Sequence, residues 1–107
     1  MQDTLEKVRR LEQYLSVDSS IIDPIFDRII DKLLERESKR MVEIKSRLTK
    51  QLKEFETHYS LQSDVFYNRY ENGEMGDETD FMEWAATMEM LANIDRRLTL
   101  LNMEPPS

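Results

Sequence analysis

Carboxylates crowd the segment between residues 71 and 83 and are the side chains most able to do chemistry in this chain. Carboxylate oxygens are preferred ligands of calcium and magnesium. The spacing does not fit an EF-hand loop, because the alternating aspartates at its start and the closing glutamate are missing. Helix capping accounts for the same residues, since acids stabilise the positive end of a helix dipole. We therefore predict no metal site and no cofactor among Glu71, Asn72, Glu74, Asp77, Glu78, Asp80 and Glu83.

Catalytic groups are scarce elsewhere. The chain has one histidine, His58, no cysteine and only two glycines. A zinc site or a nucleophile paired with histidine needs more partners than one imidazole supplies, and no phosphate-binding glycine loop is present. We expect His58 to make a favourable contact with the C-terminal end of a helix. The sequence predicts a protein that is not an enzyme and has no small-molecule substrate.

Lysines and arginines form a stripe along one long predicted helix. Projected at roughly 100° per residue, they share a sector opposite its apolar face. Such a stripe is typical of nucleic-acid binding, although Glu43 and Glu54 share the sector and the chain carries a net charge of −7. A solvated face, or one paired with acids of another chain, is the commoner explanation of such a stripe, and a nucleic-acid-binding regulator that uses this face is the alternative. Arg28 and Lys53 belong to this stripe. The other six members form the possible nucleic-acid face: Lys32, Arg36, Lys39, Arg40, Arg47 and Lys50.

Helices must position all of these groups. Apolar residues recur at three- and four-residue steps, and good helix formers dominate the chain between Pro24 and Gly73. The pattern predicts helices over residues 3–16, 23–58, 63–71 and 78–102, followed by a frayed tail at 103–107. We predict a single all-α domain. One long central amphipathic helix and shorter helices form an elongated antiparallel hairpin or bundle with coiled-coil-like packing.

The predicted helix ends have local signals. Asp23 can cap the long helix, and Pro24 suits its first position because the missing N–H costs nothing there. Ser63 or Gln62 begins the third helix, and Gly73 suits the left-handed position after it. Asp77 or Thr79 can cap the fourth helix.

An apolar seam follows the second half of the long helix. Its steps resemble those of a coiled coil, and at about 1.5 Å per residue the helix is roughly 50 Å long. A helix of that length has to protrude or pair. One hypothesis is therefore a self-associating structural coiled coil, a homodimer joined through Met41, Ile44, Leu48, Leu52 and Phe55.

Charge is distributed unevenly along the chain. Residues 1–27 carry −3, residues 28–53 carry +5, and residues 54–107 carry −9. Such asymmetry indicates a charged partner or packing of one part on another. No apolar run resembles a signal peptide or a membrane span, so we expect a cytoplasmic protein with no membrane partner.

Aromatic residues and methionines gather in the C-terminal half. Of nine aromatic residues, seven fall between Phe55 and Trp84, where we expect a rigid cluster. Methionine suits adaptable contact surfaces. Met82 and Met90 lie beside or off the predicted core stripe, and their exposure would favour a docking face.

Residues 66–91 resemble a known family. Phe66-Tyr67, Arg69-Tyr70, Gly73-Glu74-Met75-Gly76-Asp77, Asp80-Phe81 and Glu83-Trp84 are similar to the pattern FYxRFxxGExGDDxDFFEWxA of small prokaryotic helical proteins. Those proteins are encoded beside TumE-type toxin-like proteins and look like the antitoxin half of the pair. The resemblance covers roughly residues 20–100, and the chain departs from the pattern at Met82 and Glu78-Thr79.

The resemblance implies an antitoxin-like protein that masks a small basic toxin. An acidic protein suits this role, because complementary charge speeds encounter and suppresses wrong partners. We expect the acidic loop and one face of the fourth helix to dock on the partner. The predicted contact residues are Tyr67, Tyr70, Glu74, Met75, Asp77, Asp80, Met82 and Trp84.

Overall fold

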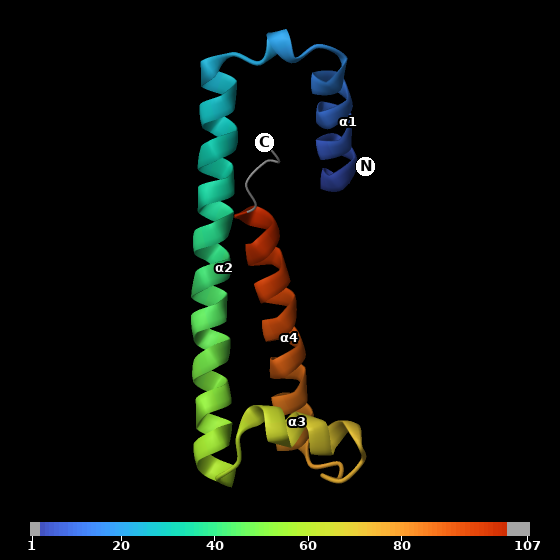
Figure 1. The fold of residues 1–107 in the computed structure, drawn as a ribbon, viewed down its shortest axis with the longest axis vertical. Helices are drawn as coiled ribbons and strands as arrows, with labels where there is room; N and C mark the ends of the chain where they lie inside the picture. Colours follow the sequence, from blue (N-terminus) through green and yellow to red (C-terminus); the bar gives the residue numbers. More distant parts are fainter. Residues whose placement is uncertain (1–2, 103–107) are drawn as a thin grey trace. The chain divides into compact units, whose positions relative to one another are not determined.

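The computed structural model describes residues 3–102, and within that range every regular element is helical (Figure 1). The predicted all-α fold is confirmed. Each predicted helix boundary lies within one residue of the observed one, and the predicted tail at 103–107 lies outside the described residues. The elements are α1 (Thr4–Val17), a 3-10 turn η1 (Ser19–Ile21), α2 (Pro24–Tyr59), α3 (Ser63–Glu71) and α4 (Thr79–Leu101).

Aspartates start the first three elements. Asp3 Oδ1 accepts the amide of Leu5 at 3.0 Å before α1, and Asp23 Oδ1 accepts the amide of Phe26 at 2.7 Å before α2. Asp18 follows α1 and caps η1 by accepting the amide of Ser20 at 2.9 Å. This backbone hydrogen bond favours the carboxylate and lowers the pKa of Asp18. The predicted cap at Asp23 and the break after α1 are therefore both present.

The helix α3 begins at Ser63 after Gln62, as predicted, whereas the cap residue of α4 differs from the prediction. Glu78 is the cap residue of α4 and its side chain makes no capping bond, so the prediction of Asp77 or Thr79 was wrong. Gln62 precedes α3, also without a side-chain bond. Glu56 of α2 instead accepts the amide of Ser63 at 2.9 Å. Tertiary packing supplies this cap, and local sequence signals could not show it.

The chain divides into two compact units, residues 3–35 and residues 36–102, and α2 belongs to both. The division falls where the apolar stripe of α2 is interrupted. Between Leu34 and Met41 there are six consecutive polar residues, Glu35 to Arg40. A stretch without apolar side chains gives neighbouring helices little to pack against, which explains why the helix continues while its packing changes.

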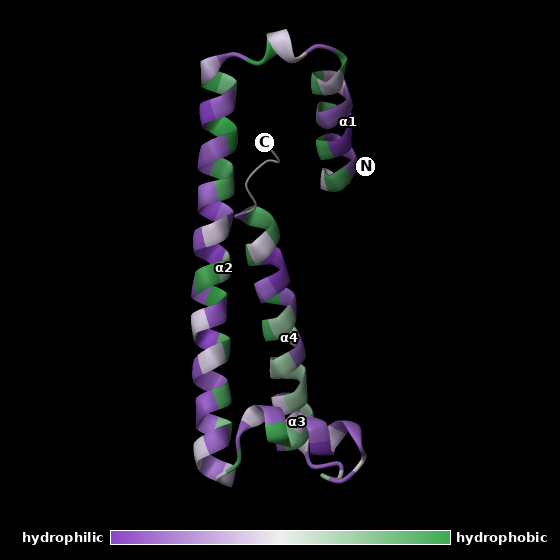
Figure 2. Ribbon diagram, in the orientation of Figure 1, coloured by the Kyte–Doolittle hydropathy of each residue, from purple (hydrophilic) through white to green (hydrophobic). Residues whose placement is uncertain are grey.

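The first unit has no buried residue between positions 3 and 35. Its apolar side chains recur along α1 and the beginning of α2, as the green bands of Figure 2 show. Helices as short as α1, which has 14 residues, are marginal in water without tertiary packing. Something other than an internal core must therefore stabilise this unit.

The second unit contains the core. The part of α2 from residue 36 onward runs antiparallel to α4, and α3 closes the end where α2 finishes (Figure 1). One buried cluster joins Met41 and Leu48 to Ile94. The other lies at the closed end and is formed by Leu52, Phe66, Phe81, Trp84 and Ala85. An ion pair between Lys45 Nζ and Asp95 Oδ1, 2.7 Å apart, bridges the same two helices at the surface.

Within residues 3–102, no helix combines the length and the apolar character needed to cross a lipid bilayer.

Candidate functional site

A stacked aromatic cluster supports the predicted contact surface from beneath. The rings of Trp84 and Phe66 lie 3.9 Å apart and nearly parallel, and both side chains are fully buried. Phe55 stacks on Trp84 at 5.4 Å. The indole N–H of Trp84 donates to Ser63 Oγ at 2.9 Å, which satisfies the one polar group of the side chain. The predicted rigid cluster is present, but Trp84 cannot meet a partner directly, so its prediction as a contact residue was wrong.

The loop between α3 and α4 begins with a Schellman motif. Gly73 has a φ of +74°, and its amide donates to the carbonyl of Tyr70 at 3.0 Å. The amide of Glu74 donates to the carbonyl of Arg69 at 2.9 Å. This pair of bonds ends the helix and fixes the direction in which the loop leaves it. The predicted role of Gly73 is confirmed.

The loop presents carboxylates and anchors itself with one apolar side chain. Glu74 and Asp77 are exposed. Met75 is half-buried and packs against the aromatic cluster. Of the predicted contact residues in the loop, two therefore face solvent, while Met75 mainly holds the loop on the core.

Asp80 is engaged with α2. Its Oδ2 accepts the hydroxyl of Tyr59 at 2.6 Å, and Tyr59 itself packs on Phe81 and Trp84. The hydrogen bond to Asp80, helped by desolvation and the nearby negative charges of Asp80 and Glu78, raises the pKa of Tyr59 to about 12. Asp80 is half-buried, so it ties α4 to α2 and only part of it remains available for a partner.

Tyr67 and Tyr70 lie at the edge of the core and are half-buried. The hydroxyl of Tyr67 donates to Glu89 Oε1 at 3.1 Å. Hydrogen bonding to Glu71 contributes most to raising the pKa of Tyr67 well above its usual value, followed by desolvation and by Glu89. The ring of Tyr70 packs on Phe66 at 5.6 Å. Each tyrosine therefore presents only part of its ring to solvent.

An exposed methionine row runs along α4. Met82 and Met90 are 56% and 48% exposed. Four-residue steps place Met82, Ala86 and Met90 on one face of the helix. The sequence indicated that exposure of these methionines would favour a docking face, and both are exposed. The row is flanked by the exposed carboxylates Glu83 and Glu89.

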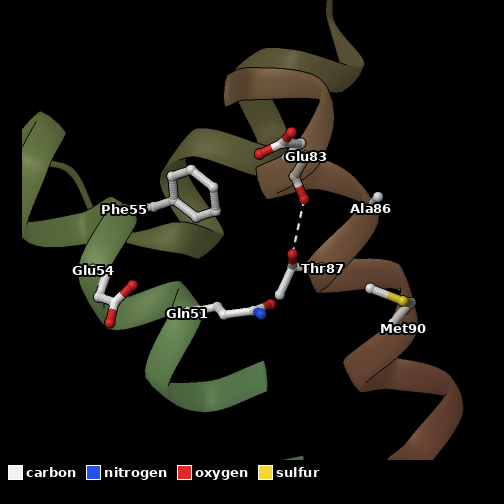
Figure 3. Close-up of a pocket in the computed structure, with 7 residues that line it drawn as sticks. All are labelled: Gln51, Glu54, Phe55, Glu83, Ala86, Thr87 and Met90. Carbon is white, nitrogen blue, oxygen red and sulfur yellow. Dashed lines mark hydrogen bonds between the residues drawn. The ribbon is translucent and has the colours of Figure 1, made fainter. Parts of the chain in front are cut away.

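A groove between α2 and α4 adjoins this row (Figure 3). It has a volume of about 410 Å³ and combines apolar walls with a carboxylate from each helix, Glu54 and Glu83. Thr87 directs its hydroxyl to the carbonyl of Glu83 at 2.8 Å, so that polar group is already satisfied. Sequence reasoning did not find the groove, because it depends on how two helices meet. Its lining residues are Gln51, Glu54, Phe55, Glu83, Ala86, Thr87 and Met90.

The predicted intermolecular seam lies inside the chain instead. Met41, Leu48 and Leu52 are each 7% exposed and pack with residues of α3 or α4. Ile44 and Phe55 are half-buried against the same clusters. The predicted apolar seam is present on α2, but α4 of the same chain covers it. The prediction that these five residues join two copies was wrong.

The basic residues of α2 are exposed, and carboxylates accompany some of them. Arg40 donates to both carboxylate oxygens of Glu37 at 3.0 and 3.1 Å, and Arg36 lies 3.8 Å from the same group. The remaining predicted nucleic-acid residues of the second unit, Lys39, Arg47 and Lys50, are exposed, as is Lys32 in the first unit.

The described residues bring together no cluster of three or more potential metal ligands among histidine, aspartate and glutamate. His58 lies in the last turn of α2, as expected. Its ring meets that of Tyr59 edge-on at 4.6 Å.

In the second unit, an acidic loop, a row of exposed methionines and a mixed groove therefore lie over one rigid core. Comparisons with protein-family models, with curated proteins and with solved structures find no match for this chain.

Proposed function

We propose that this protein is a non-catalytic interaction module whose second unit binds and masks a small basic protein, in the manner of an antitoxin. The observation that carries the proposal is the groove beside Met90, where Glu54 and Glu83 flank apolar walls. A lysine or arginine side chain fits this combination, because its aliphatic stem packs on apolar surface while its charged head pairs with carboxylates.

The negative charge of the C-terminal half of the chain also supports a basic partner. Residues 54–107 carry twelve acids and three bases. A field of one sign attracts a partner of the opposite sign and speeds association. Methionine side chains beside the groove adapt to irregular surfaces and supply the apolar contact that charge alone lacks.

The core explains how the surface keeps its shape. Trp84 and Phe66 are fully buried, Met75 anchors the loop, and the hydrogen bond from Tyr59 to Asp80 joins α2 to α4. A surface held rigid before binding loses less conformational entropy when a partner docks.

The test is affinity capture from the native host with tagged protein, in parallel with and without nuclease treatment. We expect one small basic protein in near-equal amount in both arms, released by raised salt. The double variant Glu54→Lys with Glu83→Lys should bind it at least about tenfold more weakly, a loss of about 1.4 kcal/mol. The control Glu43→Lys makes the same kind of charge change at an exposed site outside the groove.

Masking requires a second measurement. The captured protein, purified separately, should lose its own activity as this chain is added, with an end point at a fixed molar ratio. Capture that is unaffected by the double variant would place the contact elsewhere. Recovery of nucleic acid, with all proteins lost after nuclease, would instead support binding through the exposed row that includes Arg47 and Lys50.

A further inference from the structure

Exposed apolar residues are concentrated in the first unit. Of the sixteen exposed large hydrophobic residues in residues 3–102, eleven lie between positions 5 and 34. Leu5, Val8 and Leu11 repeat at three-residue steps on α1, and Ile25, Ile29 and Leu33 at four-residue steps on α2. The exposed fractions of these six residues run from 37% for Leu11 to 72% for Ile25. No residue of the unit is buried, so these faces lack a core of their own.

The extent of this surface suits an interface between proteins. Eleven large side chains that are about half exposed present apolar area on the order of 800 Å², which is what each partner of a standard interface buries. A short helix such as α1 also needs tertiary packing to be stable.

Charge along α2 indicates which partner covers the surface. On one edge of the apolar face lie Asp27 and Asp31, and on the other edge lie Arg28 and Lys32. All four side chains are exposed. When two such helices pair in parallel about a two-fold axis, the acidic edge of each faces the basic edge of the other. An antiparallel pair would set like charges against each other.

A second copy of this chain fits better than the basic partner of the second unit. Residues 1–35 carry eight acids and five bases, a mixed surface with little attraction for a strongly basic protein. A copy supplies both the matching apolar face and the complementary edges. Two copies also bring four helical segments, enough to enclose a core as four-helix bundles do.

We infer that the first unit is a self-association surface, through which two copies pair in parallel along the first part of α2 while α1 covers the rest of the apolar face. The dimer carries two acidic second units and therefore two copies of the groove. The inference is independent of the proposed function, since the two units use different surfaces.

The first test is the solution mass of the full chain, measured by sedimentation velocity and by light scattering at micromolar concentrations. We expect a dimer. Leu33→Asp should raise its dissociation constant at least about 100-fold, because a carboxylate would enter the apolar contact on both copies. The control Val42→Asp changes another exposed apolar residue of α2, outside the first unit. Emission from the buried Trp84 verifies that the second unit of each variant is folded.

Charge reversal tests the parallel arrangement. Replacing Asp27 and Asp31 by lysine should weaken the dimer, because each new lysine edge faces the basic edge of the copy. Adding Arg28→Asp and Lys32→Asp should restore it. The inference would be overturned if the wild-type chain were a monomer, or if Leu33→Asp left the dimer unchanged. It would also be overturned if the lysine variant weakened the dimer and the added aspartates did not restore it. A monomer that captures a foreign protein only when Leu33 is intact would assign the face to that protein.

Discussion

The indole nitrogen of Trp84 on α4 donates a hydrogen bond to the hydroxyl of Ser63 at the start of α3, over 2.9 Å. Both side chains are buried. The bond joins two elements separated by the acidic loop, and it satisfies a polar group that stacked aromatic rings would otherwise isolate from water.

Ser63→Ala should therefore destabilise the second unit. The mutation leaves the N–H of Trp84 buried without an acceptor, which costs about 1–3 kcal/mol in the free energy of unfolding. Urea denaturation followed by tryptophan fluorescence measures the change. The control Ser46→Ala removes an exposed serine from α2 and should alter stability by less than about 0.5 kcal/mol. Equal effects of the two mutations would mean that this hydrogen bond has no special role in stability.

Leu48→Ala tests the packing of the seam within one chain. Leu48 is 7% exposed and packs in a cluster with Ile94, so its truncation should lower the unfolding free energy by about 2–4 kcal/mol. The loss should be the same at low and high protein concentration, because the contact is intramolecular. Val42→Ala, at an exposed position of the same helix, should have little effect. A loss that grows smaller at high concentration would show that the seam joins two copies.

The hydrogen bond between Tyr59 and Asp80 makes stability depend on pH in alkaline solution. The pKa of Tyr59 is raised from 10.0 to about 12 in the folded protein, so folding favours the neutral phenol. The stabilisation is complete below pH 10, where both states are protonated, and is lost as pH rises toward 12. Ultraviolet titration of the phenols measures this shift. Asp80→Asn should lower the pKa of Tyr59 toward 10, whereas Asp77→Asn, in the exposed loop, should leave it unchanged.

Two left-handed backbone positions should respond in opposite directions. Gly73 has a φ of +74°, and no other atom lies within 4 Å of the space that an added methyl group would occupy. Gly73→Ala should therefore lower the free energy of unfolding by about 1 kcal/mol, because alanine disfavours this left-handed backbone conformation. Ser60, just after α2, has a φ of 51°. Ser60→Gly should raise the free energy of unfolding by up to about 1 kcal/mol, because glycine adopts this conformation without steric cost. Thermal and urea unfolding measure both changes. Destabilisation by Ser60→Gly would contradict the left-handed geometry at this position.

Local signals determined most of the secondary structure. Apolar periodicity placed the four helices, Asp23 with Pro24 marked the start of α2, and Gly73 marked the end of α3. These signals act within a few residues, through dihedral preferences and capping bonds, so they can be identified in a single sequence. They gave the wrong cap residue for α4, and for α3 they gave the start but not the side chain that caps it. For α3 the missing cap, Glu56, lies on another helix.

The sequence by itself determined that this chain forms helices, which residues share a face, and where acids and aromatics gather. Only the tertiary structure decided which of those faces is covered. It buried Trp84, placed the seam from Met41 to Phe55 against α4, and left Met82, Met90 and the apolar faces of residues 3–35 exposed. Periodicity shows that a helix has an apolar face, but several faces compete for the same neighbours. The outcome depends on side-chain fit between segments far apart in the chain.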